Sequence, residues 1–378
     1  MKIVFAGGGT GGHFFPIIAV AEEILNIVDE KKLLPPDLIY IADKPFNEKV
    51  LFEHNIRFKR APAGKVRMYF SILNFFDFFK TLVGILKAII LLFNIYPDIV
   101  FSKGGYPSFP IVVAARFLRI PVFIHDSDAV PGRANLYAAK YAVRIAIAYP
   151  EAIDYFKAYK EKVALIGNPV RKEIQRPTKD GSYEYLGLDP EIPTLLFLGG
   201  SQGAQAINDV LLEALPDLIQ KYQIIHQTGA NNFESVSGTA KVVLENNPYK
   251  HRYKAFGFLN DLALKMSAGI TELIIARSGS NTIAEIASWE KPAILIPIPE
   301  SVSRDQRKNA YAYARTGASI VIEQANLTHH LLVAEINRIM EDEALRKKMR
   351  EASKSFQRLD AARKLAEEIV HIALQHEA

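Results

Sequence analysis

The chain has 378 residues, more than one hydrophobic core ordinarily holds, so two domains of about 150 to 200 residues each are expected. The 46 basic and 41 acidic side chains leave a net charge of +5, which suits an anionic ligand or surface and is too small to predict nucleic-acid binding. No cysteine is present, which excludes disulfides and thiolate metal sites.

The N-terminus predicts a strand, a glycine turn and a helix. Residues 1–6 form a short apolar run, Gly7 to His13 supply the turn, and apolar residues at helical spacing begin at Pro16. Glycine lets the backbone approach a ligand closely, and the start of the following helix favours an anion. A strand predicted over 38–42 continues the alternation that is typical of a parallel sheet. Lys2 is followed by too few apolar residues for a signal peptide, so a cytoplasmic protein is expected.

The segment 59–96 has the least ordinary composition. It begins with basic residues and continues with a run of phenylalanine and aliphatic residues that ends near Phe93. Asp77, Lys80 and Lys87 interrupt the run, which argues against a transmembrane helix. Two interpretations stay open: helices packed on the sheet, or an exposed aromatic face that lies, with its basic neighbours, on an anionic membrane.

Polar residues follow the remaining strands of the first half, which are predicted over 98–102, 121–124, 145–148 and 163–166. Lys103 to Ser108 form a second glycine turn, and His125 to Asp128 follow the next strand. Ligands of open α/β sheets bind beyond the carboxyl ends of the strands, so these residues are site candidates. Gly167 to Arg171, with glycine and asparagine before proline, predict a hinge.

The pattern then starts again. Strands are predicted over 194–198, 223–227, 251–255, 273–276, 293–297 and 319–322, and Gly199 to Ala204 repeat the first glycine turn. We therefore expect an α/β protein with two Rossmann-like domains, over 1–166 and 167–355. A C-terminal helix is expected over 356–378, and its candidate packing partner is the first domain.

The segment Arg277 to Glu285 carries the clearest ligand pattern. Small polar residues at a helix start can hold a diphosphate, and Glu285 can accept hydrogen bonds from two ribose hydroxyls. The alternatives are that Ser280 and Asn281 only cap the helix and that Glu285 is a solvated helix residue. The first glycine turn is not a clean G-x-G-x-x-G and no P-loop lysine follows it, so neither a dinucleotide enzyme nor a P-loop enzyme is predicted.

Taken together, seven segments resemble the MurG family of bacterial glycosyltransferases, which is glycosyltransferase family 28. They are GGGTGGH at 7–13, KGGYPS at 103–108, GNPVR at 167–171, GGSQGAQAIN at 199–208, HQTG at 226–229, RSGSNTIAEIA at 277–287 and DQRKNA at 305–310. The resemblance implies the GT-B fold, in which two Rossmann-like domains with parallel sheets face each other across a cleft.

The same resemblance implies a reaction and a setting. The reaction is inverting transfer of N-acetylglucosamine from UDP-N-acetylglucosamine to the C4 hydroxyl of the muramoyl sugar of lipid I, a polyprenyl-diphosphate-linked acceptor. The product is lipid II, a precursor in peptidoglycan synthesis. The enzyme would be peripheral, on the cytoplasmic side of the plasma membrane and against its anionic surface.

Roles for individual residues also follow from the resemblance. The acceptor-binding residues it implies are Thr10, Gly11, Gly12, Gly104, Gly105, Tyr106 and Asn135. The donor-binding residues it implies are Arg171, Ser201, Gln202, Gly203, Asn208, Leu259, Ser280, Asn281, Thr282, Glu285, Gln306 and Asn309. Within the donor set, the backbone of Leu259 would meet the uracil, Glu285 the ribose and Gln306 the sugar.

The acceptor hydroxyl needs a base, and the catalytic candidates are His13, Asp126 and Asp128. A helix start disfavours the charged form of His13; the alternative is that His13 only donates a hydrogen bond in a phosphate loop. The chain departs from the family at His125 to Asp128, where the family generally has His-Glu-Gln-Asn, and at Arg304 to Gln306.

Metal chemistry has one sequence argument for it. Asp126-Ser127-Asp128 spells the DxD motif that binds a metal diphosphate in the other glycosyltransferase fold. In the fold expected here, helix N-termini can stabilise the departing UDP, so no metal or other cofactor is predicted.

Rival functions stay open. A UDP-N-acetylglucosamine epimerase would share the fold and need no lipid acceptor, and a glycosyltransferase acting on diacylglycerol would share the donor. A less favoured rival is a non-catalytic scaffold that retains UDP binding. The sequence leaves the oligomeric state open.

Overall fold

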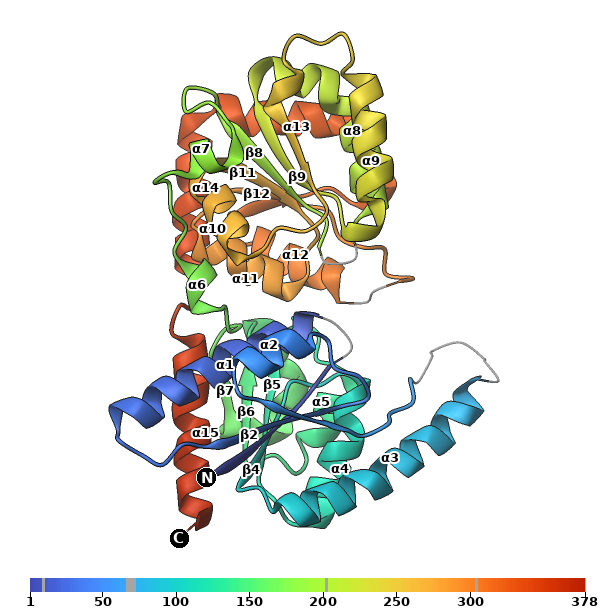
Figure 1. Cartoon of the computed structure of the whole chain (residues 1–378), viewed down its shortest axis with the longest axis vertical. Coiled ribbons are helices and arrows are strands. Elements are labelled where there is room, and N and C mark those ends of the chain that lie inside the picture. Colours follow the sequence, from blue (N-terminus) through green and yellow to red (C-terminus); the bar gives the residue numbers. More distant parts are fainter. Residues whose placement is uncertain (9–10, 66–72, 201–202, 303–304, 378) are drawn as a thin grey trace. The chain divides into compact units, whose positions relative to one another are not determined.

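The computed structural model describes residues 1–8, 11–65, 73–200, 203–302 and 305–377, and the chain divides into two compact units (Figure 1). The first unit consists of residues 1–171 and 358–378, and the second of residues 172–357. The first division thus falls after Arg171 rather than after Ile166. Gly167 and Asn168 stay with the first unit, because the Gly167 carbonyl oxygen lies 2.8 Å from His125 Nε2 and Asn168 Oδ1 lies 3.2 Å from Lys103 Nζ.

In the described part of the first unit, seven parallel strands form one sheet in the order β3–β2–β1–β4–β5–β6–β7. Their bounds are β1 Lys2–Ala6, β2 Asp37–Ala42, β3 Arg57–Arg60, β4 Ile99–Ser102, β5 Val122–Asp126, β6 Arg144–Ile147 and β7 Val163–Leu165. Along β1, Ile3 and Phe5 belong to the core on one face and Val4 and Ala6 to the core on the other. A sheet that is apolar on both faces must be covered on both.

Helices cover the two faces of this sheet (Figure 1). Helix α1, Gly11–Glu30, lies on the face of Ile3 and Phe5, and helices α3, Leu73–Ile95, and α4, Phe109–Phe117, lie on the other face. Shorter elements are α2 Glu48–Glu53, α5 Arg133–Ala138 and the 3₁₀ segments Tyr106–Ser108 and Pro150–Lys162. The prediction that the first helix starts at Pro16 is wrong: α1 starts at Gly11, so Gly11, Gly12 and His13 form its first turn.

Strand β3 is a strand that the sequence did not predict. Its residues read Arg-Phe-Lys-Arg, and the three charged ones are exposed. The strand lies at the edge of the sheet, beside β2. Charged side chains at a sheet edge discourage pairing with other chains, and they also remove the apolar pattern from which a strand is recognised.

In the described part of the second unit, six parallel strands form a sheet in the order β10–β9–β8–β11–β12–β13. Their bounds are β8 Thr194–Leu198, β9 Gln223–Gln227, β10 Tyr253–Phe256, β11 Thr271–Ala276, β12 Ala293–Leu295 and β13 Ser319–Val321. In both sheets the first strand of the unit lies between the second and the fourth, which is the order of a Rossmann fold.

The helices of the second unit connect these strands. They are α6 Lys172–Gln175, α7 Ser182–Leu186, α8 Gln205–Lys221, α9 Phe233–Val243, α10 Asp261–Ile270, α11 Ser280–Ser288, α12 Gln306–Ala314, α13 His329–Glu341 and α14 Glu343–Phe356. Short 3₁₀ segments are Ala230–Asn232, Lys250–Arg252 and Gln324–Asn326. Apolar residues of α8, α9 and α13 pack on Leu195 and Phe197 of β8.

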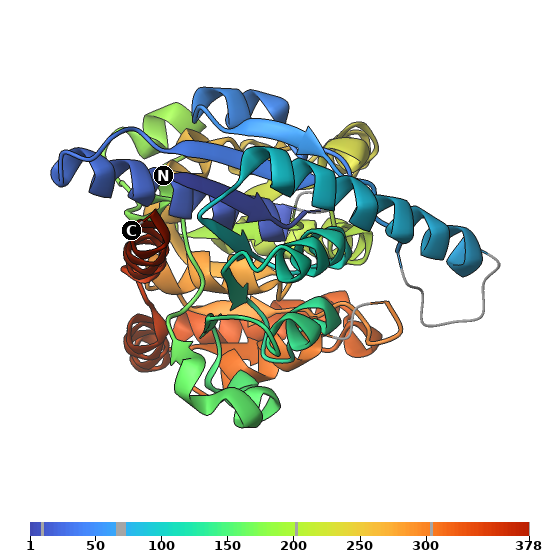
Figure 2. The same cartoon turned by 90° about the horizontal axis from the view of Figure 1, so that it is seen from below.

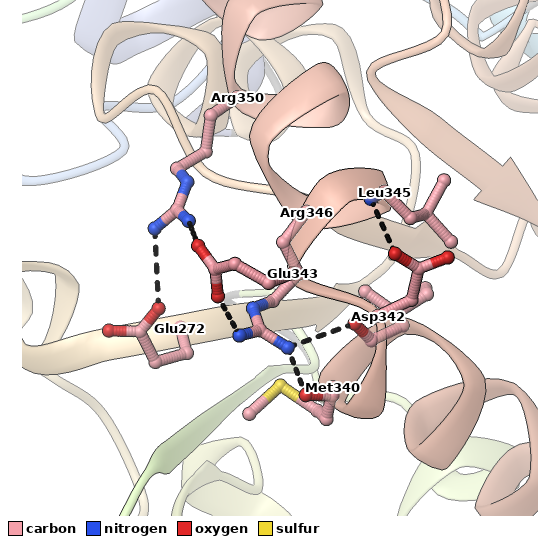
Figure 3. Close-up of polar contacts among 8 residues, drawn as sticks. Glu272, Met340, Asp342, Glu343, Leu345, Arg346 and Arg350 are labelled. Atoms are coloured by element: carbon pink, nitrogen blue, oxygen red, sulfur yellow. Dashed lines mark hydrogen bonds and ion pairs between the residues drawn. The ribbon is translucent and has the colours of Figure 1, made fainter.

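A charged network fixes the start of α14 (Figure 3). Glu343 lies between Arg346 and Arg350, and Arg350 also reaches Glu272 of β11, with Nη1 3.5 Å from Oε2. Asp342 accepts the N–H of Leu345 at 2.9 Å and so caps the helix. Exposed ion pairs of this kind contribute less than about 1 kcal/mol each, so the network orients α14 on β11 more than it stabilises the fold.

The C-terminal helix α15, Ala361–Glu377, belongs to the first unit and packs against α1 (Figure 1). Leu365, Ile369 and Val370 are buried in the same core as Ile3 and Phe5. At its surface, Arg363 Nη2 lies 2.6 Å from Glu30 Oε2 of α1. The last residues of the chain therefore complete the core that its first residues begin.

We expect Ile369→Ala to destabilise the first unit by about 2–5 kcal/mol, because it removes a fully buried side chain and leaves a cavity. Hydrogen exchange followed by mass spectrometry should show faster exchange in peptides of α1. The matched control is Leu374→Ala on the same helix, where the side chain is 38% exposed and little change is expected. Equal protection of α1 in both variants would contradict the proposed packing.

Candidate functional site

Two glycine loops lie side by side at the carboxyl edge of the first sheet. Because β1 pairs with β4, the loop after Ala6 adjoins the loop after Ser102. Gly104 and Gly105 have φ of 80° and 77°, a region that favours glycine. A Cβ on Gly105 would lie 3.3 Å from His13 Nε2, so the second loop approaches His13 closely only as glycine. Ligands of Rossmann-like sheets bind at this reversal of strand order.

His13 lies half-buried in the first turn of α1. Burial and the charge of Lys103 lower the pKa of His13 to about 4, while the charge of Asp128 opposes the shift. The imidazole is therefore neutral at pH 7 and able to accept a proton. The sequence attributed the neutral form to the helix start, whereas burial and Lys103 are the larger causes.

Asp126 holds a turn together. Its Oδ1 accepts the N–H of Asp128 at 3.1 Å, and its Oδ2 accepts the N–H of Gly132 at 3.0 Å and the side-chain amide of Asn135 at 2.9 Å. Burial and then the charge of Asp128 raise the pKa of Asp126 to about 7. Asn135 is also buried and donates to the His125 carbonyl oxygen at 3.1 Å. The side chains of Asp126 and Asn135 therefore fix the conformation of the turn that follows β5.

The other acceptor-side candidates differ in exposure. Gly12 is exposed, while Gly11 is buried and a Cβ there would lie 3.2 Å from the rings of Phe15 and Phe46. Tyr106 is 38% exposed beside the glycine loop, and Asp128 is half-buried. Of the three base candidates, the structure brings His13 and Asp128 into electrostatic contact and commits Asp126 to the turn. Thr10 lies outside the described residues.

A buried polar cluster behind these loops escaped the sequence reasoning. Lys103 is 2% exposed, and its Nζ lies 2.6 Å from His125 Nδ1, contacts Ser127 Oγ and lies 3.2 Å from Asn168 Oδ1. Burial lowers the pKa of Lys103 to about 7. The signal was present, because a lysine directly after a buried strand and before two glycines has little access to water.

The corresponding loop of the second unit also requires glycine. Gly203 has φ of 76°, and a Cβ there would lie 2.5 Å from the Thr228 carbonyl oxygen and 2.4 Å from Asn232 Nδ2. The loop leads into α8, just as Arg277 to Gly279 lead into α11 from the neighbouring strand β11. Ser201 and Gln202 lie outside the described residues.

Helices α8 and α11 begin at residues that carry no capping side chain, Ala204 and Gly279. Helices α7, α9 and α12 likewise have no capping side chain, whereas α10, α13 and α14 are capped by the side chains of Asn260, Thr328 and Asp342. The interpretation of Ser280 and Asn281 as helix caps is therefore wrong, because Gly279 occupies the cap position. Two adjacent helix starts with no capping side chain at the N-cap position suit an anionic ligand.

Further donor candidates surround the start of α11. Ser280, Asn281 and Thr282 lie half-buried in its first turn, and Glu285 lies half-buried one turn later. The main chain of Gln306, at the start of α12, accepts the hydroxyl of Ser278 at 2.9 Å, which joins the two helix starts.

Three donor candidates are held by the protein itself. The N–H of Leu259 donates to Gln227 Oε1 at 3.2 Å. The uracil of the donor could therefore accept this N–H only by displacing Gln227. Asn208 is fully buried and its amide donates to the Thr228 carbonyl oxygen at 3.1 Å. Asn309 is fully buried as well. Gln227 lies in one of the sequence motifs, but the sequence did not predict that it binds Leu259. Its Nε2 also donates to the Gly200 carbonyl oxygen at 3.3 Å.

Arg171 is placed in the first unit, where its guanidinium stacks over the ring of Phe15 at 4.2 Å from the centroid. Its predicted donor role stays a prediction. Among the described residues, no group of three or more histidine or acidic side chains is arranged to hold a metal ion. The aspartates of the DxD sequence are separated in role, since Asp126 is occupied by backbone and amide donors.

Helix α3 exposes a broad aromatic face. Phe75, Phe76 and Phe78 are 63–65% exposed, and Ile90 and Phe93 continue the exposed apolar surface. Figure 2 shows the start of α3 extending beyond α4 and α5 of its own unit. The prediction of a helix packed on the sheet is confirmed by Ala88 and Leu92, which are fully buried, while the face that carries these phenylalanines is exposed.

The other side of α3 is fastened to the first unit. Lys80 Nζ donates to Asp43 Oδ2 at 2.7 Å, and a Cβ on Gly84 would lie 1.8 Å from the Pro62 carbonyl oxygen. The stretch Phe75–Ile95 is long and apolar enough to cross a membrane, with mean hydropathy 2.0, so its charges do not exclude a span by composition. The attachments through Lys80 and Gly84 are those of a surface helix. Helix α1 is also long and apolar enough to cross a membrane, but it is mostly buried inside the first unit.

Comparison with known proteins identifies the family. The sequence profile of the glycosyltransferase family 28 N-terminal domain matches residues 3–147, and that of the family 28 C-terminal domain matches residues 194–365. The chain belongs to glycosyltransferase family 28. It is therefore an enzyme, and the N-terminal match lies within the first unit while most of the C-terminal match lies within the second.

Curated relatives of this family 28 enzyme carry one name. A Clostridium botulinum (strain Hall) protein is 34% identical over 344 residues, 90% of this chain and 91% of its own. A Bacillus thuringiensis (strain Al Hakam) protein is 34% identical over 340 residues, 89% of this chain and 91% of its own. Both are named UDP-N-acetylglucosamine–N-acetylmuramyl-(pentapeptide) pyrophosphoryl-undecaprenol N-acetylglucosamine transferase.

Solved structures share the fold. Acinetobacter baumannii MurG has a TM-score of 0.72 at 24% identity and covers 98% of this chain and 99% of its own. A Neisseria meningitidis UDP-GlcNAc 2-epimerase has a TM-score of 0.67 at 15% identity and covers 98% of this chain and 100% of its own. The GT-B fold expected from the sequence is thus confirmed, and the fold by itself does not separate transferase from epimerase.

Proposed function

We propose that this enzyme transfers N-acetylglucosamine from UDP-N-acetylglucosamine to the C4 hydroxyl of the muramoyl sugar of lipid I and so forms lipid II. The observation that carries the proposal is the likeness to relatives of that name, 34% identical over about nine-tenths of both chains. The exposed face of α3 supports a lipid-borne acceptor, which the epimerase alternative would not need.

The donor half of the reaction needs stabilisation of a departing diphosphate. The starts of α8 and α11 offer backbone N–H groups with no side-chain cap, and Ser280 to Thr282 add hydroxyl and amide donors beside them. Such groups stabilise the charge that develops on the diphosphate as the bond to the sugar breaks. We assign the ribose hydroxyls to Glu285, which lies one turn further along α11.

The acceptor half needs a group that removes a proton from the C4 hydroxyl. We assign this role to His13, because its neutral imidazole lies at the glycine loops and next to the charge of Asp128. As the hydroxyl oxygen bonds to C1 of N-acetylglucosamine, the bond from C1 to the diphosphate oxygen breaks, UDP leaves with the electron pair, and His13 takes the proton. Asp128 then stabilises the imidazolium that forms.

A product assay tests this function. The purified enzyme is incubated with radiolabelled UDP-N-acetylglucosamine and either lipid I or diacylglycerol, and lipid-extracted and aqueous products are separated. We expect label in the lipid fraction with lipid I alone. Labelled diacylglycerol would favour the second glycosyltransferase, and an epimerised UDP-sugar formed without any lipid would favour the isomerase. UDP binding without turnover in a single-turnover experiment would favour the scaffold.

Replacement of Glu285 tests the donor site. Glu285→Ala removes two hydrogen-bond acceptors for the ribose, so we expect the KM for UDP-N-acetylglucosamine to rise about tenfold or more, since bonds to a charged group contribute about 1.5–3 kcal/mol each. The KM for lipid I should stay unchanged. Glu351→Ala, an exposed glutamate on α14, is the control. Wild-type kinetics in the Glu285 variant would remove this residue from the site.

We also propose that the exposed face of α3 lies on the anionic inner surface of the plasma membrane. Its phenylalanine rings would enter the boundary between head groups and acyl chains, and the exposed Lys59 and Lys65 would meet anionic lipids. Arg67 lies outside the described residues. The lipid-linked acceptor would then reach the enzyme from the surface on which α3 rests.

Vesicle flotation tests the membrane proposal. The double variant Phe75→Ser and Phe78→Ser should bind phosphatidylglycerol-containing vesicles at least about tenfold more weakly, because a buried phenylalanine contributes about 1.5–3 kcal/mol. The control is Phe52→Ser, since Phe52 is 84% exposed on α2, away from α3 in the sequence. Equal flotation of all three proteins, or no flotation of the wild type, would contradict the proposal.

A further inference from the structure

We propose that Lys103 is a positioning residue for the transfer reaction: its buried ammonium group adds to the burial of His13 in keeping that imidazole uncharged, and it fastens the glycine loop after β4 to β5 and to Asn168. The electrostatic part of this inference concerns the protein alone. Its catalytic consequence rests on the proposed function, in which His13 accepts the proton of the acceptor hydroxyl.

The contacts of Lys103 match an ammonium group. Three acceptors surround Nζ: His125 Nδ1 at 2.6 Å, Ser127 Oγ, and Asn168 Oδ1 at 3.2 Å. An ammonium group has three N–H donors and no acceptor, so each donor of the charged form has an acceptor here. Asn168 Oδ1 also accepts the hydroxyl of Ser127 at 3.0 Å, which joins the three partners to one another. The hydrogen-bond pattern thus accommodates the charged lysine.

His125 serves as an acceptor because its tautomer is fixed from the other side. Its Nε2 lies 2.8 Å from the Gly167 carbonyl oxygen, which can only accept, so Nε2 carries the hydrogen and Nδ1 presents a lone pair. Burial and the charge of Lys103 both lower the pKa of His125 well below its usual value. One lysine and one neutral histidine therefore tie β4, β5 and the segment at 167–168 into one buried unit.

The side chains of Lys103 and His13 leave the backbone close to each other. Gly7 separates the two side chains: a Cβ on Gly7 would lie 3.3 Å from Lys103 Cβ and 3.8 Å from His13 Cβ. The loop that follows Lys103 also approaches the imidazole at Gly105. A Cβ on Gly105 would lie 3.3 Å from His13 Nε2. The positive charge of Lys103 disfavours a second positive charge on the imidazole of His13.

Titratable groups on the neighbouring elements affect the protonation of Lys103 and His13. His13 comes from α1, His125 and Asp126 from β5, and Asp128 from the turn that follows. Within the described residues, no carboxylate lies within 4.0 Å of Lys103 Nζ, so its charge is not cancelled by a direct ion pair. Asp126 and Asp128 favour the charged form of Lys103 from a greater distance, and Asp128 favours protonation of His13.

The competition between Lys103 and Asp128 suits a proton acceptor. Lys103 keeps the imidazole deprotonated before the reaction, and Asp128 compensates the charge once the proton has arrived. Loss of the lysine should therefore let His13 take up a proton at a higher pH and so lose its function in mildly acidic solution. A merely structural lysine would affect stability without moving the titration of His13.

The test is a direct titration of His13 by nuclear magnetic resonance, with histidine-labelled full-length protein and no substrate. His13→Gln assigns the signal. In the wild type, the imidazole should stay neutral down to a pKa of about 4. In Lys103→Met, which removes the charge and leaves an unbranched side chain one atom shorter, the midpoint should move upward toward the 6.5 of an ordinary histidine. Equal midpoints in the two proteins would overturn the proposal.

Two further variants keep the test decisive if Lys103→Met fails to fold. Asn168→Asp places a carboxylate beside Nζ and cancels the charge with nearly unchanged shape, so the midpoint of His13 should again rise. Ser127→Ala removes one hydrogen bond of Lys103 and leaves its charge, so the midpoint should stay low while the protein loses stability. A rise with Ser127→Ala as large as with Asn168→Asp would show that packing, and not charge, controls His13.

Kinetics supply the catalytic readout. In Lys103→Met, kcat for transfer to lipid I should fall at pH 6 and recover toward pH 8, with the KM for UDP-N-acetylglucosamine unchanged. A parallel loss at both pH values would overturn the link between Lys103 and the proton acceptor. Because the titration needs no substrate, it stands or falls independently of the acceptor that the enzyme uses.

Discussion

A crevice opens in a parallel sheet where two neighbouring strands send their following helices to opposite faces. β1 leads into α1 on the face of Ile3 and Phe5, and its neighbour β4 leads through a short 3₁₀ segment into α4 on the face of Val4 and Ala6. The loops that follow β1 and β4 therefore diverge toward opposite faces of the sheet. They stay in contact at Gly7 and Gly105, where a Cβ would lie within 3.3 Å of the other loop or of His13. The second sheet repeats this strand order at β8 and β11. Both candidate half-sites depend on this one topological constraint.

Electrostatics divides the two half-sites into different kinds. In the second unit, the candidate phosphate site is made of backbone N–H groups and small polar side chains. These groups carry no net charge, so they need no counter-charge when no ligand is bound. In the first unit, Lys103, His125 and Asp126 are buried, His13 is half-buried, and desolvation shifts the pKa of each of the four. Protonation states are thus set by the fold in the half where a proton must be moved.

Much of this architecture could be predicted from the sequence. The apolar strands, their alternation with helices and the glycine turns gave two Rossmann-like halves, because each is a local pattern. Strand β3 could not be recognised, since Arg57 to Arg60 lack an apolar run and pair through the backbone. The start of α1 at Gly11 was missed because glycines suggest a turn, although the first turn of a helix needs few side-chain contacts.

Within the site, motifs named the right loops but not the contacts inside them. Asp126 was a candidate base, yet it is buried and accepts three N–H groups, which depends on the path of residues 128–135. The partners of Lys103 come from two separate segments, 125–127 and 168, so no local spacing in the sequence predicts them. The exposure of α3 likewise depends on which side of the helix meets Pro62 and Asp43.

The return of α15 to α1 has a consequence for how the protein is made. The second unit is continuous in sequence, from residue 172 to residue 357, whereas the first waits for residues 358–378. A ribosome adding about 5–20 residues per second needs roughly 10–40 s between finishing Arg171 and releasing α15. During that interval the apolar surface of α1 that later meets Ile369 is uncovered. The first domain to be synthesised is therefore the last to be completed, and chaperones have this surface to protect.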